Sequence, residues 1–229
     1  MARLLRLALA GHPHLAAQRG HDQGVIVRDD ADRQAWLALL RDAAVTQRVD
    51  LHAWALLDDE FLLVATPSSP EGLSRLMQAL ARRHAAAFNR RHGRSGTLWD
   101  GRFRAALLQP GGWLADAMLM VELQPVRAGL VADPAEWPWS SLRHHLGAQR
   151  DPGITECGAW WALGNTPFDR EAAWRRRVAE GLAALRLARL STGLRRGWPV
   201  GEPDFLAALQ AQVAKPLSPR PRGRPARDR

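Results

Sequence analysis

The chain has 229 residues, enough for one ordinary domain with an appendage or for two small domains. Its apolar fraction of 46% is that of a globular protein, and its formal net charge of +9 predicts an affinity for polyanions. A single cysteine, Cys157, excludes an intrachain disulfide and a cysteine-based zinc site. No apolar run reaches bilayer length and Arg6 interrupts the apolar start of the chain, so we expect a soluble cytoplasmic protein that makes no membrane contact.

The first half of the chain predicts a strand, a helix and a β-hairpin, in that order. A first strand is expected at 14–19. Asp29 and Asp30 can cap a helix that runs to about Arg48, because apolar residues follow them at helical spacing. Two short apolar runs, 51–57 and 61–66, flank an acidic dipeptide, which is typical of a β-hairpin.

The next segments predict a second helix, a strand and a third helix. An amphipathic helix is expected over 71–92, and Gly93 to Gly96 end it. A strand follows at 103–108, and a helix at 113–123 ends before Pro125. The order β, α, β, β, α, β, α indicates an α+β protein and fits a ferredoxin-like split βαβ sandwich.

The composition changes after Gly147. Residues 148–168 are rich in glycine, proline and tryptophan and read as a loop, whereas 169–190 and 202–213 are expected to be helices. We therefore assign 148–214 to a helical extension. The remainder, 215–229, has too few apolar residues to pack and is expected to be a disordered basic tail.

Three segments carry a resemblance to a known family. They read FNRRHGRSGTLWDGRFR at 88–104, ELQPVRAGLV at 122–131 and EWPWSSLRHHLG at 136–147. In this order and spacing they resemble the REP-associated, IS200-like single-tyrosine transposases, which process single-stranded DNA and DNA hairpins. The resemblance implies that 1–147 is a transposase domain with the ferredoxin-like fold. We expect the aromatic residues of WPWSS to pack this segment back onto the core.

The catalytic residues of that family are missing from this sequence. The family needs two histidines that flank one hydrophobic residue and hold a divalent metal, and a tyrosine that attacks the phosphate. By alignment, Glu60 and Leu62 stand at the histidine positions and Met120 stands at the tyrosine position. The whole chain lacks tyrosine, so no shift of the alignment restores the nucleophile. We expect a pseudoenzyme that binds DNA, with no catalytic residue, no metal site and no cofactor.

Two alternatives remain open at this point. Asp58, Asp59 and Glu60 could hold Mg²⁺ or Mn²⁺ and support hydrolysis by water, which would make the protein a metal-dependent nuclease or transposase. A solvated turn explains the same three acids, and we favour it. The protein could also be an RNA-binding regulator, because phosphate and stacking contacts serve RNA as well as DNA.

The positive evidence for nucleic-acid binding is a run of arginines between the second helix and the following strand. Arginines at a helix end followed by a glycine-rich turn can track a phosphate backbone. Trp99 offers a stacking face for an unpaired base, although an aromatic residue is more often part of the core. Arg127 contacts phosphate or pairs with Glu122. The predicted DNA-binding residues in this part of the chain are Arg82, Arg83, Asn89, Arg90, Arg91, His92, Arg94, Trp99, Arg102, Arg104 and Arg127.

The basic tail carries a second DNA-binding pattern. The sequence Arg222-Gly223-Arg224-Pro225 resembles the core of an AT-hook, whose extended Arg-Gly-Arg fits the narrow minor groove of AT-rich duplex DNA. We therefore predict DNA contacts for Arg222 and Arg224. A non-specific basic tail is the alternative. Binding to cellular DNA would place the protein at the nucleoid, and the sequence leaves the oligomeric state open.

Overall fold

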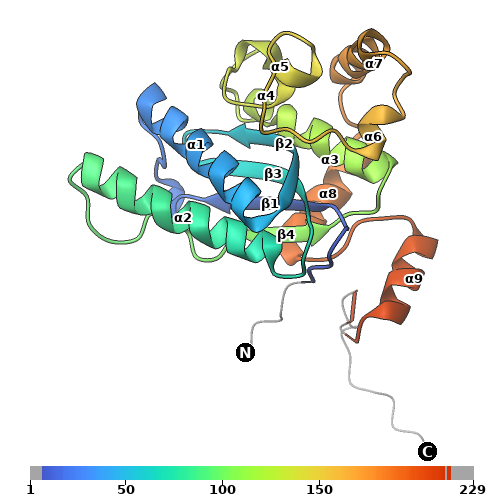
Figure 1. Ribbon diagram of the computed structural model, residues 1–229, viewed down its shortest axis with the longest axis horizontal. Helices are drawn as coiled ribbons and strands as arrows, with labels where there is room; N and C mark the ends of the chain where they lie inside the picture. The colour runs from blue at the N-terminus through green and yellow to red at the C-terminus, as the bar shows by residue number, and fades with distance from the viewer. Residues whose placement is uncertain (1–6, 215, 218–229) are drawn as a thin grey trace, which may run out of the picture.

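The computed structural model describes residues 7–214, 216 and 217, and its centre is a four-stranded sheet. All strand pairs are antiparallel, and the strand order is β2-β3-β1-β4. With the helices between them, the strands follow the order β1-α1-β2-β3-α2-β4 (Figure 1). This topology confirms the predicted ferredoxin-like split βαβ sandwich. The strands are β1 (His14–Arg19), β2 (Val49–Leu56), β3 (Glu60–Pro67) and β4 (Arg104–Leu107).

Helices α1 (Asp30–Gln47) and α2 (Gly72–Arg91) pack side by side on one face of the sheet (Figure 1). The helix predicted after Asp29 begins as expected, because the Asp29 carboxylate accepts a hydrogen bond from the Asp32 backbone N–H at 3.0 Å. Trp36 of α1 packs against Phe61 of β3, with ring centroids 5.1 Å apart, and both side chains are fully buried. These contacts form the first core.

The opposite face of the sheet carries a second core. Helix α3 (Gly112–Glu122) covers β2 and β3, and α8 (Ala184–Arg196) covers β4, as Figure 1 shows. Strand residues alternate between the two cores: Leu62 belongs to the second and Leu63 to the first. Because both faces are covered, β2 and β3 read as nearly continuous apolar runs.

The segment after residue 147 differs from its prediction in two respects. Residues 148–168, expected to be a loop, contain the short helix α6 (Gly158–Trp161). The single helix expected over 169–190 is two helices, α7 (Pro167–Glu180) and α8, which are separated at Gly181. Gly181 has φ 72° and ψ −170°, a conformation open to glycine and strained for other residues. The break turns the chain, so that Leu190 and Leu194 of α8 reach the second core.

A buried carboxylate ties the extension to the ferredoxin-like part. Glu122, at the end of α3, is fully buried and accepts three hydrogen bonds. The donors are the indole N–H of Trp174 on α7 at 2.8 Å, the Ser141 hydroxyl at 2.5 Å and the His145 Nδ1 at 2.5 Å. A buried charge is stable only when its lone pairs are satisfied, so the bond from Trp174 holds α7 against the end of α3.

Short chain segments cover both edges of the sheet. Beside β2, the Leu56 N–H donates to the Trp139 carbonyl at 2.9 Å, and the Thr155 N–H donates to the Leu51 carbonyl at 2.7 Å. The aromatic segment WPWSS therefore packs back onto the core, as predicted. Beside β4, the Val200 N–H donates to the Leu107 carbonyl at 2.8 Å.

The remaining elements are short. No helix in the described part of the chain is long and apolar enough to cross a bilayer. The remaining helices are η1 (His21–Gln23), α4 (Gln124–Arg127), η2 (Pro134–Glu136), α5 (Leu142–His145), α6 (Gly158–Trp161) and α9 (Pro203–Gln212).

Candidate nucleic-acid interface

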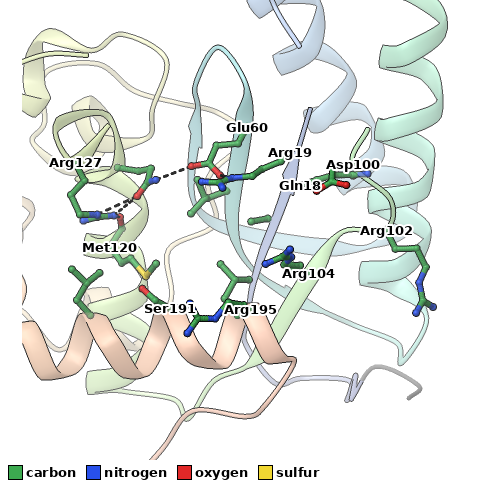
Figure 2. Close-up of a pocket in the computed structure, with 15 residues that line it drawn as sticks. Gln18, Arg19, Glu60, Asp100, Arg102, Arg104, Met120, Arg127, Ser191 and Arg195 are labelled. Atoms are coloured by element: carbon green, nitrogen blue, oxygen red, sulfur yellow. Dashed lines mark hydrogen bonds and ion pairs between the residues drawn. The ribbon is translucent and has the colours of Figure 1, made fainter. Parts of the chain in front are cut away.

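A cleft of about 380 Å³ lies on the α3 side of the sheet, between the strands, α3–α4 and α8. The three positions that the family resemblance assigns to catalytic residues, Glu60, Leu62 and Met120, all line it; Glu60 and Met120 are labelled in Figure 2. Residues that are far apart in sequence, on β3 and α3, therefore lie at one site. The full lining is Ala17, Gln18, Arg19, Glu60, Leu62, Asp100, Arg102, Arg104, Met120, Gln124, Arg127, Leu187, Ser191, Leu194 and Arg195.

The register of the sheet explains the floor of the cleft. Leu62 of β3 lies opposite Ala17 of β1, and Ala17 lies opposite Arg104 of β4. The same register sets Arg19 opposite Glu60. Since side chains alternate along a strand, these residues all face α3, and the cleft has an apolar centre with charged residues at its rim.

Five arginines converge on this cleft from separate parts of the chain. Two acidic residues, Glu60 and Asp100, are the only opposing charges among its lining residues. A concave site with an excess of one charge concentrates counter-ions, here anions. The arginines are Arg19, Arg102, Arg104, Arg127 and Arg195, and each is exposed to solvent.

Glu60 connects two of these arginines in a hydrogen-bonded chain. Its Oε2 accepts from the Arg19 Nε at 2.6 Å, and its Oε1 accepts from the Gln124 Nε2 at 2.8 Å. The Gln124 Oε1 in turn accepts from the Arg127 Nη2 at 2.8 Å (Figure 2). The hydrogen bond to Glu60, together with its negative charge, raises the pKa of Arg19, so this guanidinium stays charged.

Arg127 does not pair with Glu122, which was one of its two predicted roles. Glu122 is committed to its buried network, while Arg127 donates to Gln124 and to the Met120 carbonyl. Partial burial lowers the pKa of Arg127 to about 10, against the opposing effect of Glu60, and the group remains protonated at neutral pH. Arg127 lines the cleft, and its phosphate contact stays a prediction.

The site does not fit the divalent metal that the family resemblance implies. Leu62 offers no ligand atom, and both oxygens of Glu60 are engaged by Arg19 and Gln124. Among residues 7–214, 216 and 217, no group of three or more histidine, cysteine, aspartate or glutamate side chains could hold a metal ion. The three acids of the nuclease alternative do not form a metal site either, because Asp58 pairs with Arg33 at 2.6 Å. Burial, and then the nearby Glu60 charge, raises the pKa of Asp59.

The arginine segment around the end of α2 is divided between two places. Arg102 and Arg104 reach the cleft, whereas 82–94 lies on α2 and its C-terminal turn, on the opposite face of the sheet. Several of the predicted contacts there already have protein partners. Arg83 pairs with Asp42, Arg91 with Asp29 and Asp32, His92 with Asp32, and the Asn89 side chain donates to the Gly96 carbonyl. Arg82, Arg90 and Arg94 are exposed.

Trp99 is a core residue, so its predicted stacking on an unpaired base is not available in this conformation. Its side chain packs edge-on against Phe61, with ring centroids 5.7 Å apart, and also contacts His84. Its indole N–H donates to the Ala81 carbonyl at 2.9 Å. With 9% of its surface exposed, Trp99 has no face open to a nucleobase.

Two arginines of the cleft, Arg19 and Arg195, and the whole contribution of α8 were not predicted from the sequence. Arg19 stands alone at the end of β1, and Arg195 belongs to the extension. A signal existed for Arg19, because β alternation places it on the same face as Ala17. Arg195 had no comparable signal, since the packing of α8 on β4 depends on tertiary structure. The predicted contacts Arg222 and Arg224 lie outside the described residues.

The solved structures similar to this chain include two transposase structures. One is reported as "Structure of the REP associates tyrosine transposase bound to a REP hairpin"; it has a TM-score of 0.55 and 14% sequence identity, and the match covers 69% of this chain and 93% of that chain. The other is a putative transposase from Deinococcus radiodurans, with a TM-score of 0.37 and 18% identity over 57% of this chain and 95% of that chain. No sequence-family profile and no curated protein matches the chain. At this identity the first similarity shows the shared fold.

Proposed function

We propose that this protein binds single-stranded or hairpin DNA in the arginine-lined cleft and holds it without cutting it. The observation that carries the proposal is the convergence of five arginines on the site where Glu60, Leu62 and Met120 replace catalytic residues. Exposed guanidinium groups supply most of the affinity of a protein for a phosphate backbone. A protein of the same fold is bound to a REP hairpin, which supports a structured DNA as the ligand.

The absence of strand cleavage follows from the chemistry of the replacements. Phosphotyrosine formation needs a hydroxyl nucleophile, and the Met120 thioether has no proton to lose and no oxygen to attack with. Metal activation of water needs open carboxylate or imidazole ligands, which Leu62 and the occupied Glu60 do not provide. We therefore expect bound DNA to be released intact.

The location and the additional DNA contact follow from the same proposal. We expect the protein in the cytoplasm at the nucleoid, with Arg222 and Arg224 of the tail adding contacts to AT-rich duplex DNA. RNA hairpins present the same phosphates, so the choice of DNA must be tested by competition.

The deciding experiment follows binding and cleavage of one end-labelled DNA hairpin in parallel. Full-length protein is titrated in Mg²⁺ and in EDTA, and each sample is divided between a native gel and a denaturing gel. We expect salt-sensitive binding in both buffers and an intact strand in both. Metal-dependent cleavage that Asp59→Ala abolishes would establish the nuclease alternative instead. Tighter binding of a matched RNA hairpin would identify an RNA-binding protein.

A further inference from the structure

Glu60 can affect a bound polyanion in two ways, through its negative charge and through the arginine side chains that it orients. A carboxylate in a DNA-binding cleft repels phosphate, so simple electrostatics predicts that Glu60 weakens binding. The structure gives it a different environment from an ordinary repulsive acid, because Glu60 is buried with 6% of its surface exposed and both its oxygens accept hydrogen bonds.

The bonds made by Glu60 leave the outer faces of two guanidinium groups available. Arg19 uses its Nε on Glu60, and none of the hydrogen bonds among the described residues engages its Nη1 or Nη2. Arg127 uses Nε and Nη2 on Gln124 and Nη2 on the Met120 carbonyl, which leaves its Nη1. A guanidinium carries five N–H donors in a rigid plane, so fixing one edge orients the other edge.

Holding these side chains in place before a ligand arrives has a definite benefit. An exposed arginine loses rotamer freedom when it binds phosphate, and this loss reduces affinity unless the side chain is already ordered. The Arg19 side chain is 57% exposed, and Glu60 is its one hydrogen-bonding partner among the described residues; Asp59 and Asp100 act on it through their charge alone. Arg102, Arg104 and Arg195 have no such partner among the described residues and line the cleft around the hydrogen-bonded chain.

We propose that the chain Arg19–Glu60–Gln124–Arg127 is a preorganised phosphodiester clamp that takes the place of a metal ion, with Glu60 as its positioning residue. This inference rests on the proposed function, because the phosphodiester is that of the bound DNA. In the clamp, two oriented guanidinium groups offer N–H donors to a phosphate at the site where a divalent ion would otherwise bind, with a net charge of +1 because Glu60 offsets one of them. Binding is therefore independent of divalent metal, and the carboxylate strengthens binding of an anion.

The test compares two acidic residues of the same cleft. Glu60→Gln keeps the size of the side chain but turns its amide N–H toward one of two donors, Arg19 or Gln124. Asp100→Asn removes the charge of an exposed acid whose side chain accepts no hydrogen bond among the described residues. Electrostatics alone predicts up to about fivefold tighter DNA binding for both variants. The clamp predicts about fivefold weaker binding for Glu60→Gln and equal or tighter binding for Asp100→Asn. Fluorescence anisotropy of the labelled hairpin in EDTA measures both.

A second variant and a second ligand complete the design. Gln124→Met interrupts the chain on the Arg127 side and should weaken binding by about twofold to threefold, with Arg19 still held. Thermal melting confirms that each variant is folded. Inorganic phosphate, followed by ³¹P line broadening, tests the clamp without any nucleic acid.

The outcomes separate the clamp from the proposed function. If DNA binds and Glu60→Gln binds it as tightly as, or more tightly than, the unaltered protein, the clamp is wrong and the proposed function stands. If no nucleic acid binds but phosphate does, with loss in Glu60→Gln, the clamp stands and the proposed function is wrong. If neither ligand binds, both proposals are wrong.

Discussion

Replacement of Arg104 by alanine should reduce both the affinity for single-stranded DNA and the dependence of that affinity on salt. Arg104 is exposed on β4 and lines the cleft, and its side chain makes no hydrogen bond or ion pair with the described residues, so its charge is available to a phosphate. Each phosphate contact releases counter-ions, and the affinity falls with salt in proportion to the number of contacts.

The magnitude follows from the number of arginines in the cleft. With about 0.7 per contact for a single strand, five arginines set an upper limit of about −3.5 for the slope of log K against log salt concentration. Between 50 and 200 mM NaCl the affinity of the unaltered protein should then fall about a hundredfold. Arg104→Ala leaves four contacts, which gives a slope of about −2.8 and a fall of about fiftyfold.

Anisotropy titrations of a labelled oligonucleotide at several salt concentrations measure the slopes directly. The matched control is Arg75→Ala, because Arg75 is exposed on α2, on the other face of the sheet, and its loss should leave the slope unchanged. An equal effect of the two substitutions would show that net charge, and not the cleft, determines binding. A slope that stays at its original value in Arg104→Ala would refute a phosphate contact for this residue.

Three further predictions concern residues that the same structure places in the core. Trp174→Phe removes one donor from buried Glu122 and should lower the free energy of unfolding by about 2 kcal/mol in urea, whereas Trp161→Phe, 53% exposed, should change it by less than about 0.5 kcal/mol. Trp99→Phe should destabilise the protein by about 1–2 kcal/mol, yet shift its DNA affinity less than about twofold; a larger loss of binding in a folded variant would restore its stacking role. Burial lowers the pKa of His14 from 6.5 to about 4. As the pH falls, this histidine is therefore protonated in the unfolded chain before it is protonated in the folded protein, and the free energy of unfolding should fall by about 3 kcal/mol from pH 6.5 to 4. His14→Leu should remove this part of the pH dependence, and an unchanged profile would contradict it.

Local sequence signals predicted most of the fold. The cap at Asp29, the acidic turn between β2 and β3, and the apolar spacing of α2 are decided by neighbours in the chain, and each lies where it was expected. The break at Gly181 was missed because a glycine inside a helical pattern is often tolerated. Here tertiary packing decides it, since Leu190 can reach the second core only after the chain turns.

The candidate site could be predicted only in part. The family resemblance grouped Glu60, Leu62 and Met120, and the three line one cleft because their positions depend on strand register and one helix. The arginine run was predicted to form one DNA-binding surface because it is continuous in sequence. In the structure, however, the sheet separates Arg91 from Arg104. Which arginines are free also depends on acids distant in sequence, as the pairing of Arg83 with Asp42 illustrates.

The covered edges of the sheet determine which parts of the chain can be removed. An edge strand with open N–H and C=O groups is a template for aggregation. Here the Val200 N–H binds a carbonyl on the open edge of β4, and the Thr155 N–H binds one on the open edge of β2. A fragment ending at residue 147 would lose both, together with α8 over the second core. The helical extension therefore protects the ferredoxin-like part from self-association through its strands, and evolution could lengthen or vary the extension more easily than delete it.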